Sequence, residues 1–395
     1  MSKLEELIQQ YCPDGVEYKP IGDYLKYEQP TKYLVESTKY DDSYPTPVLT
    51  AGQSFILGYT KETDGIYKAS KDSPVIIFDD FTTSLHWVEF SFKVKSSAMK
   101  MLTPVDETKA LFRYLYYCMK NIMYVPGDHT RQWIGTYSQF EIPIPPLPVQ
   151  EEIVRVLDTF TELQAELQAE LQKRLQQYNY YRDNLIQKHC VGVEYKPLCE
   201  LGTFYSGLTG KSKDDFSDGN AKFITYVNIF NHPSLETDVE EKVKIAEGEK
   251  QNTVQYGDML FTGSSETPDE CGMCSVLTHH TDEEMYLNSF CFGFRFNDLN
   301  DKSPDFMKHL FRSTDIRKKI CKTANGVTRF NVSKKEFAKI EIPLLPLDVQ
   351  VKLAAILDRF FTLTTDLTAG LPAEIEKRRL QYEYYRDKLL TFKRK

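Results

Sequence analysis

Long apolar runs are absent from this 395-residue sequence, in which no stretch approaches the roughly 18 consecutive apolar residues that read as a membrane helix. The first residues, MSKLEELIQQY, alternate charge with leucine and do not resemble a secretion signal. The eight cysteines show no disulfide-framework spacing and fit reduced thiols. We therefore expect a cytoplasmic protein without a membrane partner.

Catalytic and cofactor-binding motifs are also absent. The sequence has no GxxxxGK[ST] phosphate loop, no GxGxxG after a strand, no HExxH and no Asn/Asp-Pro-Pro-aromatic run of the kind found in amino-methyltransferases. Carboxylate and lysine sets at 106–109 and 238–242 are similar to nuclease sites, but such triples often arise by chance. CGMC at 271–274 lacks the second close pair of a zinc finger. We expect no catalytic residue, no metal site and no enzyme activity in this chain.

Acidic residues outnumber basic ones overall, but basic charge is concentrated in one region. The net charge is −8, whereas residues 304–339 hold ten Lys/Arg against three Asp/Glu. A local basic face is what a nucleic-acid partner requires. Solvated lysines on a helix would produce the same count, so both interpretations remain open here.

What the sequence does contain is an internal repeat, which has to be recognised before any fold is predicted. Its three parts recur at offsets of 177, 200 and 204, and ten of twenty positions are identical in the second part. These parts are GVEYKP at 15–20 and 192–197, EIPIPPLPVQEEIVRVLDTF at 141–160 with EIPLLPLDVQVKLAAILDRF at 341–360, and YNYYRDNLI at 178–186 with YEYYRDKLL at 382–390.

The repeat is cyclic, because the residues before the first GVEYKP resemble those before the second. The N-terminus then continues the unit that begins near the C-terminus, which predicts neighbouring termini. It also predicts a pseudo-twofold arrangement, with two bodies at opposite ends of two antiparallel coiled-coil helices. We expect domains over 1–145 and 190–343, and spacer helices over 146–189 and 344–395.

The first long helix is predicted from a period of about 3.5 residues, typical of a coiled-coil seam. A continuous helix over 149–187 would be roughly 58 Å long. The second carries Gly370 and Pro372, which predict a kink or local fraying. Tetrads ELQA, ELQA and ELQK at 162–173 predict a length adjustment of roughly 6 Å each, unless they are only a low-complexity surface. The seam positions are Leu157, Phe160, Leu163, Leu167, Leu171, Tyr178, Arg182 and Leu185.

Each body is predicted to be mixed α and β, with the same order of elements. The fold class is therefore α+β, with two related α/β domains separated by the two long helices. We predict strands at 46–60, 73–83 and 85–94 before a helix at 109–122, and strands at 221–230, 258–263 and 288–297 before a helix at 304–321.

Glycine-containing loops are the candidate binding residues. GDHTRQW at 127–133 and NGVTRFN at 325–331 occupy the same place in each body, and each combines glycine, Thr-Arg and an aromatic residue. Arginine can bind guanine or phosphate with two hydrogen bonds, and SGLTGKSK at 206–213 fits a duplex backbone. Ordinary turns remain the alternative. The candidate residues are His129, Thr130, Arg131, Ser206, Thr209, Lys211, Lys213, Thr328, Arg329 and Asn331.

In combination, the repeated junctions, the GVEYKP starts and the YYRDNLI and YYRDKLL helix ends resemble the DNA-specificity subunits of type I restriction-modification systems. The resemblance covers nearly the whole chain. It implies two target-recognition domains that read the halves of a bipartite double-stranded DNA site, with the helices setting the gap. It also implies that tetrad number tunes the spacer, and that the subunit has no catalytic activity.

The resemblance further implies partner proteins: two methyltransferase subunits, to which restriction subunits add. S-adenosylmethionine would belong to the methyltransferase, and ATP and Mg to the restriction subunit, with no cofactor in this chain. A coiled-coil scaffold with protein-binding ends is the alternative function, and a stand-alone nuclease or methylase is a third. An intramolecular seam between the two helices is the alternative role for some of the candidate partner contacts. These candidates are Gln150, Arg155, Tyr180, Tyr181, Arg182, Gln350, Tyr384, Tyr385 and Arg386.

Overall fold

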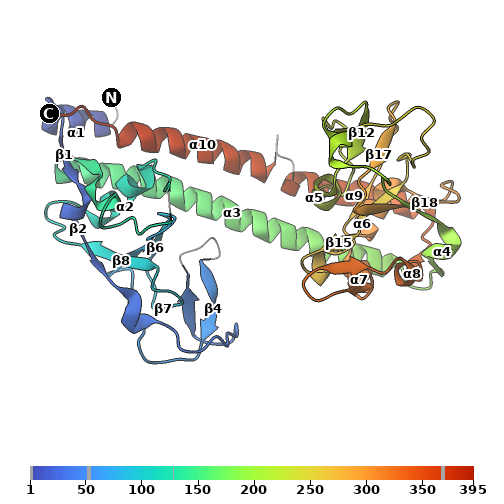
Figure 1. The fold of residues 1–395 in the computed structure, drawn as a ribbon, viewed down its shortest axis with the longest axis horizontal. Helices are drawn as coiled ribbons and strands as arrows, with labels where there is room; N and C mark the ends of the chain where they lie inside the picture. The colour runs from blue at the N-terminus through green and yellow to red at the C-terminus, as the bar shows by residue number, and fades with distance from the viewer. Residues whose placement is uncertain (1–2, 51–54, 128, 366–369) are drawn as a thin grey trace. The chain divides into compact units, whose positions relative to one another are not determined.

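The structure is a computed structural model that describes residues 3–50, 55–127, 129–365 and 370–395. It divides into unit 1, Met1–Leu167 with Ile375–Lys395, and unit 2, Gln168–Glu374. The chain therefore leaves unit 1 along one long helix, α3, and returns along another, α10 (Figure 1). The fold is mixed α and β, as predicted. Within the described ranges, no helix is long and apolar enough to cross a membrane.

Unit 1 is built on a four-stranded antiparallel sheet beside a smaller one. One of its two inner strands, Val75–Asp79, is rich in β-branched and aromatic residues. As expected for such residues, Val75, Ile76, Ile77 and Phe78 are fully buried. The larger sheet has the order β2 (Leu25–Glu28), β8 (Met99–Pro104), β5 (Val75–Asp79), β6 (Leu85–Val88); the smaller has the order β4 (Ile56–Thr60), β3 (Thr46–Leu49), β7 (Lys93–Val94). The helices are α1 (Lys3–Tyr11), α2 (Phe112–Asn121), and parts of α3 (Leu147–His189) and α10 (Leu371–Leu389).

Unit 2 contains three sheets of three or four strands. Their orders are β11 (Gly202–Ser206), β18 (Cys291–Phe296), β14 (Met259–Thr262), β16 (Cys274–Val276); β13 (Lys242–Val243), β12 (Ala221–Ile224), β17 (Met285–Leu287); and β15 (Ser264–Ser265), β20 (Phe330–Val332), β19 (Ala324–Asn325). Its helices are α4 (Leu198–Leu201), α5 (Tyr226–Asn231), α6 (Pro304–Leu310), α7 (Thr314–Cys321), α8 (Lys334–Phe337) and α9 (Leu347–Thr365), with the end of α3.

The two units have the same topology in their first two sheets. The order β2-β8-β5-β6 in unit 1 matches β11-β18-β14-β16 in unit 2. In the smaller sheets, β3 pairs in parallel with β7, and β12 pairs in parallel with β17. The predicted common order of elements is confirmed, although the sequences of the two interiors hardly match.

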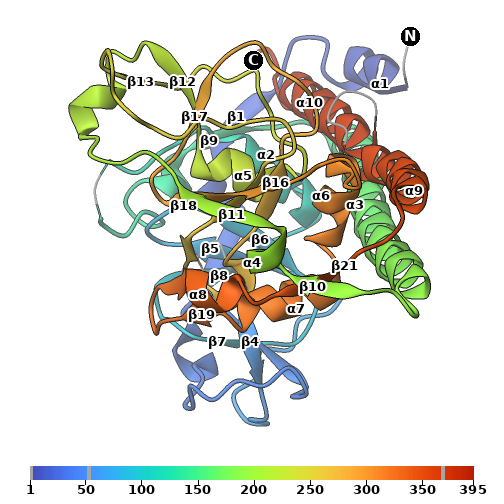
Figure 2. The ribbon, with the colours of Figure 1, turned by 90° about the vertical axis from the view of Figure 1, so that its right-hand side faces the viewer.

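The repeated motifs form a two-stranded sheet in each unit. β1 (Glu17–Pro20) pairs with β9 (Glu141–Ile144), and β10 (Tyr195–Pro197) pairs with β21 (Glu341–Pro343) (Figure 2). The chain ends also meet in unit 1, as the cyclic repeat predicts. The Val16 N–H donates to the Lys393 carbonyl, and the Lys395 N–H donates to the Val16 carbonyl (2.9 and 3.0 Å).

Helix α3 confirms the predicted first long helix, with 43 residues. All eight predicted seam residues are buried or partly buried. Within unit 1, Phe160 stacks on Tyr385 of α10, with ring centroids 5.4 Å apart. Within unit 2, Tyr181 stacks on Phe360 of α9, with centroids 5.7 Å apart.

The second long helix is described as two pieces. Helix α9 ends at Thr365 and α10 begins at Leu371, which puts Pro372 in the first turn, where a missing N–H does no harm. Three predictions fall partly outside the described residues. They are the strand at 46–60, the loop at 127–133 and the four extra residues between Asp358 and Glu374.

Three predicted elements are wrong in part. The strand predicted over 85–94 is two strands, β6 and β7, which belong to different sheets. The strand predicted over 221–230 ends at Ile224, because the Thr225 hydroxyl accepts the Asn228 N–H (3.2 Å) and caps α5. The single helix predicted over 304–321 is two helices. Ser313 has an extended backbone, and its hydroxyl donates to the Leu310 carbonyl (2.6 Å), so the chain turns between α6 and α7.

A buried glutamine near the start of each long helix joins that helix to its unit. The Gln150 side chain accepts the Leu111 N–H (2.9 Å) just before α2, and donates to the Pro145 carbonyl (2.7 Å). In unit 2, Gln350 accepts the Ser303 N–H (2.9 Å) just before α6, and donates to the Asp301 and Leu345 carbonyls (2.9 and 2.7 Å). These two glutamines are therefore structural anchors.

An aspartate eight residues further along each helix makes a second connection. Asp158 accepts hydrogen bonds from Arg113 (2.8 Å) and Tyr117 (2.5 Å) of α2. Asp358 lies 2.8 Å from both Lys308 and His309 of α6. Burial lowers the pKa of His309, against the opposing effect of Asp358, so the imidazole stays neutral near pH 7. Burial raises the pKa of Asp358, but hydrogen bonds from His309 and Lys308 outweigh burial and hold that pKa below its usual value.

We predict that Gln350→Leu lowers the free energy of unfolding of unit 2 by about 3 kcal/mol, because a buried N–H and two carbonyls lose their partner. Both tryptophans, Trp87 and Trp133, lie in unit 1, so their fluorescence follows unit 1 alone. Denaturation of the full chain should shift the transition in circular dichroism but leave the fluorescence transition in place. Gln176→Leu, at an exposed position of α3, is the matched control. Equal stability of the two variants would contradict the anchoring role.

Candidate functional site

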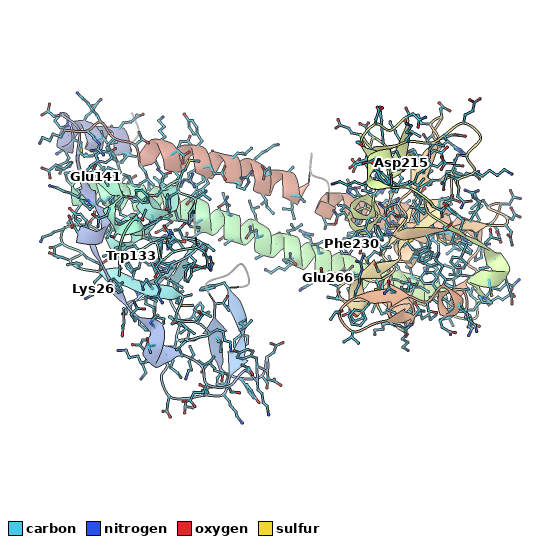
Figure 3. All side chains as sticks on the ribbon, viewed as in Figure 1. Lys26, Trp133, Glu141, Asp215, Phe230 and Glu266 are labelled. Carbon is cyan, nitrogen blue, oxygen red and sulfur yellow. The ribbon has the colours of Figure 1, made fainter. Side chains whose placement is uncertain are left out.

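The candidate loop of unit 1 is attached to the chain directly after strand β5. The Gln132 N–H donates to the Asp80 carbonyl (2.8 Å), and the Trp133 N–H donates to the Asp80 carboxylate (2.9 Å). The Gln132 amide also donates to the carbonyl of Thr130 (2.9 Å), and accepts from the Tyr124 hydroxyl (2.8 Å). Gln132 and Trp133 are buried, so they hold the loop (Figure 3 labels Trp133).

A buried ion pair lies beneath this loop. Asp80 Oδ2 is 3.1 Å from Lys100 Nζ, and both side chains are 1% exposed. Neither atom meets hydrogen-bond geometry with any described atom, so the pair is held by charge alone. Lys100 also lies 5.3 Å from the centroid of the Tyr27 ring. Asp80 thus both anchors the loop and neutralises a buried ammonium.

The loop leaves its polar residues on the surface. His129 stacks on Phe81 of the β5–β6 turn, with centroids 4.6 Å apart and an interplanar angle of 19°. Arg131 is exposed, and Ile134 beyond it is 62% exposed. Unit 1 therefore presents an imidazole and a guanidinium on a rigid support. Asp128 lies outside the described residues.

The candidate loop of unit 2 occupies the equivalent place, after strand β14. The Val332 N–H donates to the Gly263 carbonyl (2.9 Å), as Gln132 does to Asp80 in unit 1. The loop is a hairpin, since β19 and β20 are antiparallel and β20 also pairs with β15. Gly326 is required there, because a Cβ would lie 2.0 Å from the Arg329 carbonyl oxygen.

Beside this hairpin lies a cleft of about 930 Å³. Thr328 and Arg329 line it, whereas residues 206–213 are not among the described residues that do. The Arg329 guanidinium donates to the Ser264 hydroxyl through Nε (3.2 Å) and Nη2 (3.0 Å), and lies 5.9 Å from the centroid of Phe290. Phe230 and Glu266, labelled in Figure 3, also line the cleft.

Sequence reasoning missed the walls of this cleft. Ser264 lies on the short strand β15, Glu266 and Phe290 lie in a bend and a turn next to strands, and no motif links them. One signal was available, because the polar run GSSET at 263–267 follows a buried strand, as DDFTTS at 79–84 does in unit 1. Asn331, which the sequence did indicate, lies on β20 opposite Ser264.

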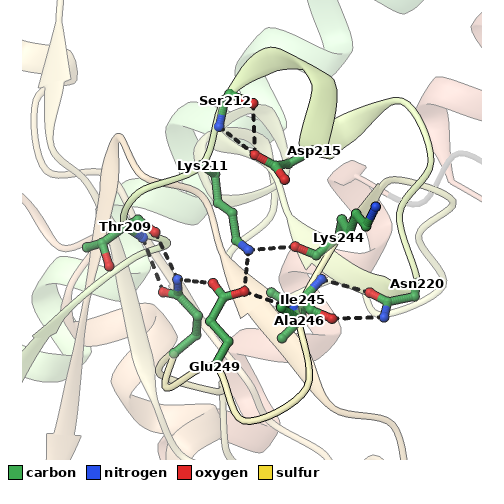
Figure 4. A network of polar contacts seen from close by, with 10 residues as sticks. Thr209, Lys211, Ser212, Asp215, Asn220, Lys244, Ile245, Ala246 and Glu249 are labelled. Atoms are coloured by element: carbon green, nitrogen blue, oxygen red, sulfur yellow. Dashed lines mark hydrogen bonds and ion pairs between the residues drawn. The ribbon is translucent and has the colours of Figure 1, made fainter.

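The third candidate loop, residues 206–213, is tied down by its own side chains (Figure 4). Lys211 donates to the Glu249 carboxylate (2.6 Å) and the Lys244 carbonyl (2.6 Å), and its side chain is only 8% exposed. Lys211 is the largest influence holding the pKa of Glu249 at about 2. The Lys211 charge is therefore already neutralised within unit 2, whereas Ser206, Thr209 and Lys213 are exposed.

Three of the candidate partner contacts are buried inside their own units. Gln150 and Gln350 are the anchors described above, and Arg182 donates to Asp183 (2.9 Å) and Asn179 (2.9 Å). Their hydrogen-bonding groups are occupied, so they stabilise the helices from within.

The other candidate contacts lie nearer the surface. Tyr180 and Tyr384, equivalent in the repeat, are 65% and 62% exposed. Tyr181 and Tyr385 carry the stacked rings, while Arg155 pairs with Glu152 (2.6 Å) and Arg386 with Asp387 (2.6 Å). An exposed tyrosine thus marks the same position on α3 and on α10.

The cysteines form no metal site in the part of the chain that the structure describes, where no group of three His, Cys, Asp or Glu could hold an ion. Burial raises the pKa of Cys274 and of Cys291 to about 12, which disfavours the thiolates that zinc requires. The Cys271 thiol donates to the Phe330 carbonyl. These thiols serve as core residues of unit 2.

Comparison with known proteins identifies the family. The type I restriction modification DNA specificity domain matches residues 13–177 and again 191–377. The chain is 41% identical to the specificity subunit of the EcoR124I/EcoR124II type I restriction enzyme of Escherichia coli, over 99% of this chain and 97% of that one. The chain belongs to the type I restriction-modification specificity family. The resemblance found from the repeated motifs is therefore confirmed.

Two further proteins described as type I specificity subunits are similar to this chain. A Haemophilus influenzae protein named as a type I specificity subunit is 28% identical over 98% of each chain. The crystal structure of the type I S subunit from M. genitalium has a TM-score of 0.51 and 13% identity, covering 96% of this chain and 97% of that one. This structural likeness supports the fold of the specificity subunit.

We predict that Asp80→Asn destabilises unit 1 of this specificity subunit by about 3 to 5 kcal/mol, because it leaves the Lys100 ammonium buried without a counter-charge. The loss should appear as an earlier tryptophan-fluorescence transition in denaturant. Asp72→Asn, at an exposed position of the same unit, is the matched control. The double variant Asp80→Asn/Lys100→Met should recover part of the loss. An unchanged transition in Asp80→Asn would show that the ion pair contributes nothing.

Proposed function

We propose that the two units are target-recognition domains that read the two halves of a bipartite site in double-stranded DNA. The observation that carries this proposal is that the two units share one topology but have different loops at the ends of the equivalent strands, β5 and β14. Arg131 lies beside a ring-stacked histidine in unit 1, whereas Arg329 lines a cleft in unit 2. A duplicated frame with divergent exposed residues is what recognition of two different sequences requires.

The surface residues fit contact with duplex DNA. Arginine, lysine and hydroxyl side chains bind phosphates and base edges. We propose that binding uses His129, Thr130, Arg131, Ser206, Thr209, Lys213, Thr328, Arg329 and Asn331, with Lys211 shaping its loop. Of the ten basic residues at 304–339, Lys308, Arg312 and Arg317 have their charged groups bound within unit 2, so the exposed basic surface is smaller than the count indicates.

The long helices are proposed as spacers between recognition domains. In this scheme residues 1–145 and 190–343 read DNA, while 146–189 and 344–395 set the distance between half-sites. Support comes from the tetrads at 162–173, which lie within α3 between the parts that contain its buried residues, 149–157 and 178–186. Each tetrad would add roughly 6 Å of helix.

We propose that two methyltransferase subunits dock on these helices, and that restriction subunits add to them. The exposed Tyr180 and Tyr384 occupy equivalent places, so two copies of one partner could each use the same contact. Arg155, Tyr181, Tyr385 and Arg386 border these tyrosines or share their helices. Exposed aromatic and arginine side chains are typical of protein interfaces.

Chemistry is assigned to the partners. The relatives are specificity subunits, a class that is in general not catalytic. We propose that S-adenosylmethionine binds the methyltransferase, that ATP and Mg bind the restriction subunit, and that this chain directs adenine methylation without binding a cofactor. Methyl transfer by the isolated chain would overturn this assignment.

Arg131→Ala is predicted to weaken DNA binding by about 1 to 3 kcal/mol and to relax base choice in one half-site only, if Arg131 contacts a base. The measurement is competition binding by the complex with its methyltransferase subunits, using duplexes substituted at one position at a time. Lys71→Ala, at an exposed position of the same unit, is the control. An equal loss on every duplex would instead assign Arg131 to a phosphate. Equal binding of all duplexes by the wild-type complex would favour a protein-binding scaffold.

Deletion of Glu166–Ala169 removes one tetrad and is predicted to shorten the spacer while both half-sites stay the same. The expected change is one or two base pairs, since roughly 6 Å of helix compares with about 3.4 Å per base step. Methylome sequencing of a host that expresses the variant measures both features. An unchanged spacer would contradict the proposed role of the tetrads.

A further inference from the structure

The cleft of unit 2 contains an arginine and a glutamate that do not bind each other. Arg329 and Glu266 both line it, yet the described partner of the Arg329 guanidinium is the uncharged Ser264 hydroxyl, and among the residues that the structure describes neither side chain has an ion-pair partner. Two opposite charges would normally neutralise each other if their side chains were free to meet. Both charged groups therefore remain available to a group outside the chain.

Arg329 is fixed before any ligand arrives. Ser264 Oγ accepts from its Nε and Nη2, and the Phe290 ring lies beside the guanidinium. Ser264 is itself held, because its strand pairs with β20 and its carbonyl accepts the Tyr226 hydroxyl (2.8 Å). One edge of the guanidinium is thus bound, which leaves Nη1 and the second Nη2 hydrogen as a two-pronged donor.

Glu266 differs from its acidic neighbour. The Glu270 carboxylate accepts from the hydroxyls of Ser265 (3.0 Å) and Thr267 (2.9 Å), so it stabilises the turn. Glu266 is exposed and has no such partner among the described residues. A free carboxylate repels phosphates, so its presence beside Arg329 disfavours a phosphate-binding role for this cleft. The Glu266 carboxylate is instead suited to accept a hydrogen bond from a base amino group.

We propose that this cleft reads a G·C base pair in the major groove, with Arg329 binding guanine and Glu266 binding cytosine. Guanine presents two acceptors, N7 and O6, to a two-pronged donor, and cytosine presents the N4 amino group to a carboxylate. The positive charge of Arg329 therefore suits the acceptors of guanine, and the negative charge of Glu266 suits the amino group of cytosine. The inference rests on the proposed function, since it names the base pair that unit 2 reads.

The test uses the chain co-expressed with its methyltransferase subunits, with methylome sequencing as the readout. Arg329→Ala removes the two-pronged donor, and is expected to reduce discrimination at one G·C position by about 10- to 100-fold. Glu266→Gln is expected to relax the same position, because an amide can also bind adenine. Glu240→Gln, an exposed carboxylate elsewhere in unit 2, should leave the motif unchanged.

Three results would overturn the inference. Arg329→Ala could methylate the wild-type motif with unchanged discrimination, which would make Arg329 a phosphate contact. Glu266→Gln could raise methylation of all sites equally, which would make Glu266 only a repelling charge. The positions that change could be A·T pairs. In each case bipartite methylation persists, whereas failure of the proposed function would appear as no bipartite motif in the wild type.

Discussion

The paired anchors on each long helix are the constraint on which the rest of the structure depends. A buried glutamine binds the start of the domain helix, and an aspartate eight residues later binds its side chains. Eight residues are about 2.2 helical turns, so the two anchors lie about 80° apart around the long helix and share one broad face. A domain attached at two points on one face cannot rotate about the helix, so the helix fixes the direction in which each loop points.

The repeated units and the first long helix could be predicted from the sequence, whereas the ends of several shorter elements could not. Repetition of GVEYKP and EIP revealed the units, and a 3.5-residue period revealed α3, because both signals depend on local patterns. The break before α7 and the helix after Thr225 depend on single capping residues inside apolar segments, so periodicity could not show them. Gln150 and Gln350 were predicted to be partner contacts on the helices, whereas their burial follows from tertiary packing.

The candidate site was predictable only where one segment forms it. The loops with Thr-Arg were found, since each is contiguous and recurs in the repeat. The cleft of unit 2 could not be found this way, because α5, the turn after β14, Phe290 and the hairpin supply its walls from positions far apart in the sequence. Lys211 shows the converse, since a lysine in a glycine loop reads as free until its partner, Glu249, is brought near by the fold.

The two strand ends show how one frame can support different recognition surfaces. After β5, the Asp80 carboxylate is occupied by Lys100 and the Trp133 N–H, which closes the site over a buried ion pair. After β14, Ser264 binds the edge of Arg329 and leaves a cleft open. Both loops keep the same backbone hydrogen bond to the residue after the strand. None of the anchors on the long helices uses a residue of either loop, so these surfaces can change their side chains without weakening the frame that positions them.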